Sequence, residues 1–384
     1  MTRILVCAGG TGGGIYPAMA AITELQGMGI RIEDILWVGT KGDMEEQLVA
    51  RAGINLETIA AGPIVGVPWA ERARNMVKLA RGMRSAGQIV RRFRPNVMFM
   101  TGGYVSAPVA VAARRNQVPI VVYLPDVEPG SSIRSVLSAA RRIACTTEGS
   151  RDYVPEAKMV VTGYPVRPEL RAALRMTRNE ALTRFKLRTE RPTLFVFGGS
   201  RGARNINRAL IGILPSLLAE VQVIHISGTL TWDEVEEASL GLPPELRAYY
   251  RPYPYLHEDM GAAFRAADLV VARAGASMLG ECPAFGLPSI LIPLTFAWRY
   301  QKVNADYLTG RGAAIQLKDE GLAETLLPAI RELLFDPARL QAMAESAAAL
   351  DRPRAAAQLA HIILEEADPP HRAVLPLEHE EASC

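Results

Sequence analysis

Residues 4–14 read ILVCAGGTGGG and residues 193–203 read TLFVFGGSRGA, so one pattern opens each half of the chain. Both stretches begin with a short apolar run that is typical of a buried strand, and both continue into a glycine-rich turn. A helical pattern follows each turn, and Pro17 suits the first turn of the first helix. A strand, a glycine-rich turn and a helix in that order place free backbone N–H groups where a phosphate can bind. We therefore expect two α/β units, each with an anion-binding turn.

Outward from these two stretches, apolar runs alternate with helical patterns along both halves of the chain. The runs that predict further strands are Ile35–Val38, Val97–Met100, Ile120–Tyr123, Ile143–Thr146, Met159–Thr162, Val221–Ile226, Leu269–Ala272 and Ser289–Ile292. This alternation is typical of parallel sheets with helices on both faces. The predicted fold is α/β, with two doubly wound, Rossmann-like domains that face each other across a cleft.

A proline-rich stretch, GYPVRPEL at residues 163–170, separates the two patterns and is the predicted hinge. We expect an N-terminal domain over residues 1–163 and a C-terminal domain over 164–349. A helix over 350–366 is expected to pack back on the N-terminal domain. Residues 367–384 are rich in proline and acidic side chains and show no core pattern, so they predict a disordered tail.

The composition of the 384-residue chain excludes several classes of protein. Its 49% apolar and 22% charged residues are not those of a disordered chain, a collagen or a coiled coil. The four cysteines are widely spaced, which argues against a disulfide scaffold or a zinc site, and we expect neither a metal nor a cofactor. Two uncharged stretches, 95–113 and 282–298, are long enough to span a membrane, but each contains helix breakers.

The net charge of +3 is unevenly distributed along the chain. Residues 1–163 carry 19 basic and 13 acidic residues, and Trp69–Arg94 alone holds eight basic residues against one acid, Glu71. Basic and apolar side chains together suit an anionic membrane surface, and a solvated basic helix is the alternative. Gly82 and Gly87 argue against one long helix here. A single basic segment in a balanced chain favours a membrane, and not nucleic acid, as the partner.

The glycine-rich turns fit neither of two familiar nucleotide-binding loops. Neither turn ends in Gly-Lys-Ser/Thr, as a Walker loop requires. A dinucleotide fingerprint would have glycine where the chain has Ile15, and an acid where the chain has Thr40. Because ligands bind at strand ends in open α/β sheets, these turns are still candidates for an acceptor or phosphate loop. The residues concerned are Gly10, Thr11, Gly12, Gly13, Gly102, Gly103 and Tyr104.

The motifs of both halves resemble those of the MurG family of peptidoglycan glycosyltransferases. They are GGTGG at 9–13, TGGYVSAP at 101–108, GYPVR at 163–167, GGSRGARNIN at 198–207, ADLVVARAGASMLGE at 267–281 and GLPSILIP at 286–293. The resemblance implies a GT-B architecture and inverting transfer of N-acetylglucosamine from UDP-GlcNAc. It implies a polyprenyl-pyrophosphate-linked muramyl-pentapeptide as the acceptor. It also implies a peripheral protein on the cytoplasmic face of the cell membrane.

The resemblance assigns the binding of the donor pyrophosphate to residues near the hinge and the second domain. Arg167 and Ser200 would contact the pyrophosphate, because guanidinium and hydroxyl groups donate to phosphate oxygens. The alternative for Arg167 is a salt bridge within the linker. The residues that would open a helix toward the phosphates are Gly275, Ala276 and Ser277.

The same resemblance assigns the residues that would recognise the ribose, the transferred sugar and the uracil of the donor. Glu281 would accept hydrogen bonds from the ribose hydroxyls, as a carboxylate does. Gln301 and Asn304, three residues apart on one helix face, would read the hydroxyls of the transferred sugar. Backbone near residues 256–258 would meet the uracil. The alternatives are a solvated helix position for Glu281 and helix surface or capping for the two amides.

The chain departs from the family motifs at several positions on the acceptor side. The histidine of the family's GGTGGH is replaced by Gly14, and the family's His-Glu-x-Asn is replaced by Tyr123-Leu124-Pro125-Asp126. Tyr164 and Tyr300 stand where the motifs have an asparagine and a glutamine. All five histidines lie at or beyond residue 225, so no histidine of the N-terminal domain can act as a base.

Inverting transfer needs a base that takes the proton of the acceptor hydroxyl. We expect this base to be Asp126, which follows a strand predicted to end at the cleft, with Glu128 as the second candidate. The alternative for Asp126 is a turn-forming aspartate after Pro125. The departures leave two other functions open: a relative with a changed acceptor or donor sugar, and a nucleotide-sugar- or lipid-binding protein without turnover.

Overall fold

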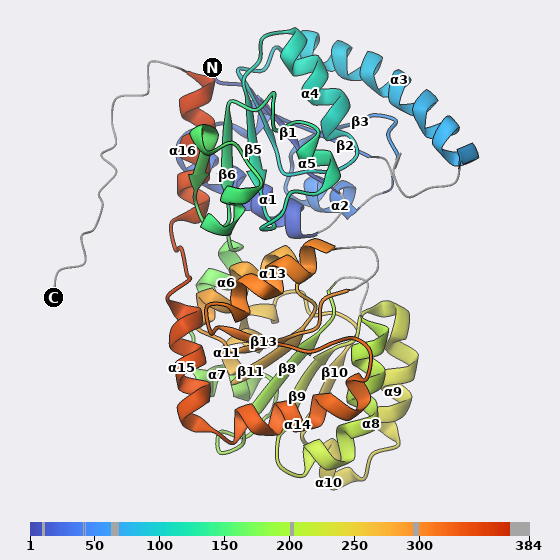
Figure 1. The fold of residues 1–384 in the computed structure, drawn as a ribbon, viewed down its shortest axis with the longest axis vertical. Helices are drawn as coiled ribbons and strands as arrows, with labels where there is room; N and C mark the ends of the chain where they lie inside the picture. The colour runs from blue at the N-terminus through green and yellow to red at the C-terminus, as the bar shows by residue number, and fades with distance from the viewer. Residues whose placement is uncertain are drawn as a thin grey trace, which may run out of the picture.

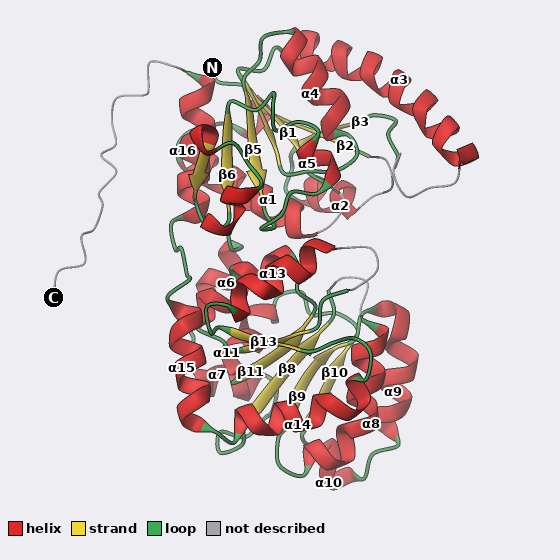
Figure 2. Cartoon of the chain, in the orientation of Figure 1, coloured by secondary structure: helices red, strands yellow, loops and turns green. Residues whose placement is uncertain are grey.

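Two parallel sheets, each with helices on both faces, form the two halves of the computed structural model (Figures 1 and 2). The structure describes residues 1–9, 12–40, 42, 44–62, 69–199, 203–294 and 299–368. The expected fold of two Rossmann-like domains is therefore confirmed. The expected tail over 367–384 starts too early, because Ala367 is still helical, and residues 369–384 lie outside the described residues.

The first sheet has seven described strands in the order β3-β2-β1-β4-β5-β6-β7, all parallel to their neighbours. They are β1 (Ile4–Cys7), β2 (Ile35–Gly39), β3 (Asn55–Thr58), β4 (Val97–Met100), β5 (Ile120–Leu124), β6 (Arg142–Cys145) and β7 (Met159–Val161). In β1, Ile4 and Val6 belong to one core, and Leu5 and Cys7 belong to the core on the opposite face. Since both faces are buried, the central strands have continuous apolar sequences.

Helices cover both faces of this sheet. They are α1 (Gly12–Gly27), α2 (Met44–Arg51), α3 (Trp69–Phe93), α4 (Ser106–Arg115) and α5 (Ser131–Arg134), with 3₁₀ turns η1 (Ile32–Asp34), η2 (Glu148–Asp152) and η3 (Glu156–Lys158). The helices α3 and α4 pack against each other, and their apolar side chains share a core with the side chain of Leu5. The helix α1 lies on the other face, in the core that contains Ile4.

The second sheet repeats the strand order of the first, as β10-β9-β8-β11-β12-β13. Its strands are β8 (Thr193–Phe197), β9 (Gln222–Ile226), β10 (Tyr250–Tyr253), β11 (Leu269–Ala272), β12 (Ser289–Leu291) and β13 (Ala314–Gln316). Its helices and turns are α6 (Pro168–Ala173), α7 (Arg178–Arg184), α8 (Arg204–Leu218), η4 (Thr229–Thr231), α9 (Trp232–Leu240), α10 (Pro244–Arg247), α11 (Met260–Ala266), η5 (Ala276–Leu279), α12 (Glu281–Phe285), α13 (Arg299–Thr309), α14 (Leu322–Leu334) and α15 (Pro337–Ala348). In both sheets the strand order reverses beside the first strand, which is where open α/β sheets bind ligands.

The chain crosses between the domains twice, and the two crossings touch. The first crossing runs from β7 to α6, and the second runs from α15 to α16 (Ala355–Ala367), which lies beside the N-terminal domain (Figure 1). Gly163 has a φ of +90°, and a Cβ at this position would overlap the side chain of Arg352. On α16, Leu359 and Ile363 are fully buried in the core that contains α1. The carboxylate of Glu366 pairs with Arg141 and Arg142, which fixes the helix to the start of β6.

The expectation of a broken helix over Trp69–Arg94 is wrong, because α3 runs without interruption from Trp69 to Phe93. Gly82 is buried where α3 meets the backbone after β3, and a Cβ at this position would overlap the carbonyl oxygen of Ala60. Glycine is therefore used here for a close approach, and it does not end the helix. Likewise, α6 begins at Pro168, inside the predicted linker, and proline suits the first position of a helix.

The described residues show neither a helix suited to span a membrane nor a cluster suited to hold a metal ion. Among their helices, none combines the length and the apolar character that a membrane crossing requires. The same residues contain no group of three or more histidine, cysteine or acidic side chains arranged to hold a metal ion.

Candidate active site

The turns after β1 and β4 lie side by side at the edge of the first sheet. The hydroxyl of Thr101 donates to the carbonyl oxygen of Gly14 at 2.9 Å. Gly102 and Gly103 have φ values of +124° and +98°, and a Cβ on Gly103 would lie 3.3 Å from the backbone of Gly9. The close approach of two backbones thus explains the glycines of the TGG motif. Of the predicted phosphate loop, Gly12 and Gly13 begin α1, whereas Gly10 and Thr11 lie outside the described residues.

Arg167 reaches from the hinge to both domains. Its Nη2 atom lies 3.3 Å from Oε1 of Glu281, and its guanidinium stacks 4.2 Å above the ring centroid of Tyr16 in α1. Its buried Nε atom has no hydrogen-bond partner among the described residues. The Tyr16 hydroxyl in turn lies 3.4 Å from the hydroxyl of Tyr255 in the C-terminal domain. An unpaired guanidinium N–H at a domain boundary is suited to a phosphate oxygen.

Glu281 is the first residue of α12 and is only 3% exposed. Burial raises the pKa of its carboxyl group, and Arg167 and a hydrogen bond from Ser277 oppose the shift. The predicted solvated helix position is therefore wrong for Glu281, because its charge is buried and paired. Arg167 does form a salt bridge, but its partner is Glu281 in α12 and not a residue of the linker.

The turn after β11 begins with Gly275, which precedes the short helix η5. A Cβ on Gly275 would find no atom within 4 Å, so this turn faces open space. Ser277 is half-buried and Ala276 is buried. Ser200, the expected partner of the pyrophosphate in the second glycine-rich turn, lies outside the described residues.

The helix α13 faces the N-terminal domain (Figure 1) and carries both predicted sugar-reading amides. Gln301 accepts a hydrogen bond from the backbone N–H of Leu294 at 3.1 Å. Asn304 is fully buried, and its Nδ2 atom donates to Oδ1 of Asp126 at 2.7 Å. The structure therefore brings a predicted donor-site residue and the predicted base into direct contact across the domain boundary.

Asp126 follows β5 and is partly buried at the boundary between the domains. Burial raises the pKa of its carboxyl group to about 6, against the hydrogen bond from Asn304 that lowers it. The carboxylate of Glu128, the second candidate, is almost fully buried and pairs with Arg134 at 2.8 Å. A pKa of about 6 suits Asp126 as a base near neutral pH.

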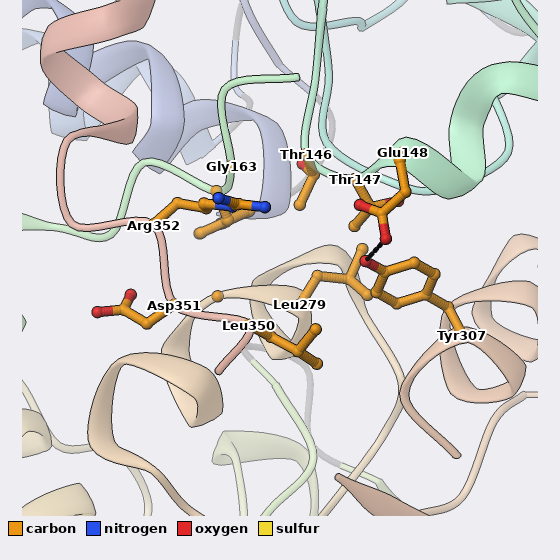
Figure 3. Close-up of a pocket in the computed structure, with 11 residues that line it drawn as sticks. Thr146, Thr147, Glu148, Gly163, Leu279, Tyr307, Leu350, Asp351 and Arg352 are labelled. Atoms are coloured by element: carbon orange, nitrogen blue, oxygen red, sulfur yellow. Dashed lines mark hydrogen bonds between the residues drawn. The ribbon is translucent and has the colours of Figure 1, made fainter. Parts of the chain in front are cut away.

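A cavity of about 40 Å³ lies at the hinge, next to the ends of β6 and β7 (Figure 3). Its lining comes from both crossings and both domains: Thr146, Thr147, Glu148, Gly163, Tyr164, Leu279, Gly280, Tyr307, Leu350, Asp351 and Arg352. Figure 3 shows the Tyr307 hydroxyl bonded to the Glu148 carboxylate beside it, at 3.1 Å. This volume suits ordered water and is far too small for a nucleotide sugar.

The outer face of α3 combines exposed apolar and basic side chains. Trp69 is 83% exposed and Met76 is 59% exposed. The exposed basic residues of this face are Lys78, Arg81, Arg84, Arg91 and Arg92. On the inner face, Ile89 and Val90 are buried against the domain. Figure 1 shows the start of α3 reaching out beyond the rest of the N-terminal domain.

Sequence reasoning missed the aromatic contacts of the site. Tyr16 stacks under Arg167, and the phenol of Tyr300 lies close enough to Asp126 and to Tyr104 for both to add to the rise in its pKa that burial causes. These pairs join residues from different turns and domains, so no local pattern in the sequence predicts them. The uracil-side segment 256–258 follows Tyr255, whose ring lies 4.5 Å from that of His257.

Comparisons with known proteins agree with this arrangement. Residues 4–144 match the glycosyltransferase family 28 N-terminal domain, and residues 193–359 match the family 28 C-terminal domain. The UDP-N-acetylglucosamine–N-acetylmuramyl-(pentapeptide) pyrophosphoryl-undecaprenol N-acetylglucosamine transferase of Roseiflexus sp. is 38% identical over 94% of both chains. The protein of the same name from Desulforamulus reducens is 37% identical over 92% of this chain and 95% of its own.

Solved structures share the fold. The crystal structure of MurG from Acinetobacter baumannii matches 95% of this chain and 100% of its own with a TM-score of 0.73, at 23% identity. The UDP-GlcNAc 2-epimerase of Neisseria meningitidis, solved with UDP-GlcNAc, covers 95% of this chain and 100% of its own with a TM-score of 0.67 at 13% identity, which is a likeness of fold alone. With both domains matched and identities above one third over nearly the whole length, the chain belongs to the MurG family of glycosyltransferases.

Proposed function

We propose that this protein is an inverting glycosyltransferase that moves N-acetylglucosamine from UDP-GlcNAc to a polyprenyl-pyrophosphate-linked muramyl-pentapeptide, the step from lipid I to lipid II. The observation that carries the proposal is the contact between Asp126 and α13. It joins a carboxylate of the N-terminal domain to the helix that carries the predicted donor-site amides. In a two-domain transferase, acceptor activation and donor binding must meet at such a boundary.

The donor pyrophosphate is proposed to lie between Arg167 and the turn at Gly275. Arg167 offers a buried Nε donor that has no partner among the described residues, and the turn has open space around Gly275 at the start of η5, where backbone N–H groups can bind phosphate. Glu281 would exchange part of its pairing with Arg167 for the ribose hydroxyls. Gln301 would use its amide N–H groups on the transferred sugar, because its oxygen is already bonded to Leu294.

In the proposed reaction, Asp126 takes the proton of the attacking acceptor hydroxyl. The hydroxyl oxygen forms a bond to the anomeric carbon of N-acetylglucosamine, and the bond from that carbon to the UDP oxygen breaks. The released negative charge of UDP falls next to Arg167. A base with a pKa of about 6 is mostly ionised at neutral pH and accepts a proton more readily than an ordinary aspartate.

The outer face of α3 is proposed to hold the protein on an anionic membrane at the cytoplasmic side. Trp69 and Met76 can enter the headgroup region, and the neighbouring basic side chains can bind anionic lipids. This placement would keep the N-terminal domain near an acceptor whose polyprenyl chain stays in the bilayer.

A UDP-release assay with UDP-GlcNAc and lipid-linked muramyl-pentapeptide tests the proposed function. We expect release that depends on both substrates, with product of the mass of the disaccharide lipid. UDP-GlcNAc binding without release would favour a protein that binds nucleotide sugars without turnover. Release with another acceptor or another UDP-sugar alone would favour a relative with changed specificity, which the replacements at Gly14 and Tyr300 make worth testing.

A further inference from the structure

One face of α13 and its C-terminal extension contacts the N-terminal domain at helical spacing. Tyr300 interacts with Asp126, and Asn304 bonds to it four residues later. Tyr307 donates to Glu148, and Arg311 just beyond the helix forms an ion pair with the same carboxylate. Residues at i, i+4 and i+7 lie on one side of a helix, so this side forms a continuous contact between the domains.

Asn304 occupies the centre of this contact, and all of its hydrogen bonds are made to protein. Its Oδ1 atom accepts from the backbone N–H of Val127 at 3.0 Å, and its Nδ2 atom donates to Asp126 Oδ1 and to the Ala274 carbonyl oxygen at 3.1 Å. The backbone N–H and the carbonyl settle which end of the amide is oxygen and which is nitrogen. The nitrogen therefore faces Asp126 and donates the hydrogen bond, and a carboxyl oxygen of Asp126 accepts it.

We propose that Asn304 is a positioning residue for Asp126, and that closure of the donor domain completes the base by bringing this amide to the carboxylate. The inference rests on the proposed function, in which Asp126 is the base. The amide of Asn304 donates to the carboxylate of Asp126 and accepts from the backbone N–H of the next residue, Val127. These two bonds fix the direction in which the second carboxylate oxygen of Asp126 points. The two bonded partners belong to different domains, so this orientation exists only in the closed arrangement. Such coupling confines proton transfer to the closed state.

The electrostatic surroundings of Asp126 agree with this role. The titratable groups that face it are the phenols of Tyr123 in β5, Tyr164 at the hinge and Tyr300 in α13. Burial raises the pKa of all three, so they are neutral at working pH. Among the described residues, the amide of Asn304 is the group whose hydrogen bond favours the ionised carboxylate, against the burial that raises its pKa.

The variant Asn304→Asp tests the contact with almost no change in shape. Its side chain can still accept from Val127, but a carboxylate oxygen replaces the donor that faces Asp126. Two carboxylates this close share a proton, so the titration of Asp126 should move upward by at least about one pH unit. Carbon-13 NMR of protein labelled at the aspartate carboxyl groups measures this titration without turnover, with Asp126→Asn to assign the signal.

Tyr307→Phe is the matched control, because it removes another hydrogen bond between the domains from the same helix. It should leave the Asp126 titration unchanged, whereas Asn304→Asp should move it. With both substrates, Asn304→Asp should lower kcat by about tenfold or more and move the acid limb of the pH profile upward, with unchanged Kd for UDP-GlcNAc.

The opposite pattern would overturn the proposal: an unmoved Asp126 titration together with weaker binding of UDP-GlcNAc but not of UDP. Asn304 would then read the donor sugar, as the resemblance implies. An absence of transfer by the unsubstituted protein would contradict the proposed function alone, because the NMR titration still decides whether Asn304 holds Asp126.

Discussion

Asp126→Asn should abolish transfer and, at neutral pH, make the protein more stable. Burial raises the pKa of Asp126 from 3.8 to about 6. A carboxyl group whose pKa is higher in the folded than in the unfolded state costs stability as the pH rises through this interval, because the unfolded chain ionises first. Two pKa units correspond to about 3 kcal/mol. Since the carboxyl is only partly buried and solvent screens it, we expect a net gain of about 1–2 kcal/mol for the neutral amide.

Denaturant unfolding at pH 7 and at pH 4.5, together with UDP-release kinetics, measures both effects. The substituted side chain keeps an oxygen that accepts from Asn304, so the domain contact should survive. The gain in the free energy of unfolding should shrink at pH 4.5, where the folded wild-type carboxyl is protonated. Loss of a general base should lower kcat by about 10²- to 10⁴-fold. Equal destabilisation at both pH values, or kcat near that of the wild type, would refute the reasoning.

Three further predictions concern α3 and the donor site. Gly82→Ala should lower the melting temperature because its methyl group meets the Ala60 carbonyl. Gly87→Ala should stabilise the helix by about 1 kcal/mol, because its methyl group meets only the end of the Arg91 side chain, at 3.8 Å. Equal shifts of the two variants in thermal melts would argue against this packing. Charge reversal at Arg81 and Arg84 should weaken sedimentation with anionic vesicles by at least about tenfold, and added salt should do the same, whereas binding that ignores both would contradict a membrane role for α3. Glu281→Gln should weaken UDP binding in calorimetry by about tenfold, and unchanged affinity would remove the ribose from the proposed role of Glu281.

Most strands that the sequence predicts have both faces buried, and β7, a partly exposed edge strand, is an exception. The runs at β1, β4, β5, β8 and β11 are continuous and apolar because each strand lies inside a sheet with helices on both sides. The strands β3, β10 and β13 escaped prediction, and all three are edge strands. In β3 the sequence Asn-Leu-Glu-Thr is partly exposed along its whole length, so burial does not demand an apolar run. Edge strands are specified by their neighbours, which a linear reading of the sequence does not supply.

The candidate site divides in a similar way. Arg167, Glu281 and Asn304 could be named from the sequence because they stand in motifs with fixed spacing. Their partners could not, because Tyr16 stacks on Arg167 from 151 positions away and Asp126 meets Asn304 from 178 positions away. Pairing across two domains depends on how the sheets face each other. The expected contact of Asn304 with sugar hydroxyls therefore competes with its hydrogen bond to Asp126, which only the tertiary structure reveals.

The replaced residues of the N-terminal domain bear on whether catalysis has survived. Tyr123 is fully buried, and its hydroxyl bonds to Thr146 Oγ1 at 2.7 Å and donates to the Gly163 carbonyl oxygen. Burial raises the pKa of this phenol well above its usual value, so it cannot act as a base. At Gly14, a Cβ would lie 3.0 Å from the Thr101 hydroxyl, so Thr101 already occupies the space next to the position of the family's histidine.

The hydrogen-bond partners of the remaining carboxylates decide which of them can act as a base. Two described carboxylates of the N-terminal domain, Glu148 and Asp126, bond to α13 or its extension. Burial would raise the pKa of Glu148, but hydrogen bonds from its own backbone and from Arg311 lower it overall, which leaves it a weak base. Among the described residues, Asp126 is bonded by the neutral amide of Asn304 and by no cation, and burial raises its pKa to about 6. We propose that Asp126 takes the role of the histidine that Gly14 replaces, because an aspartate with a pKa of about 6 can take a proton in the range where a histidine would.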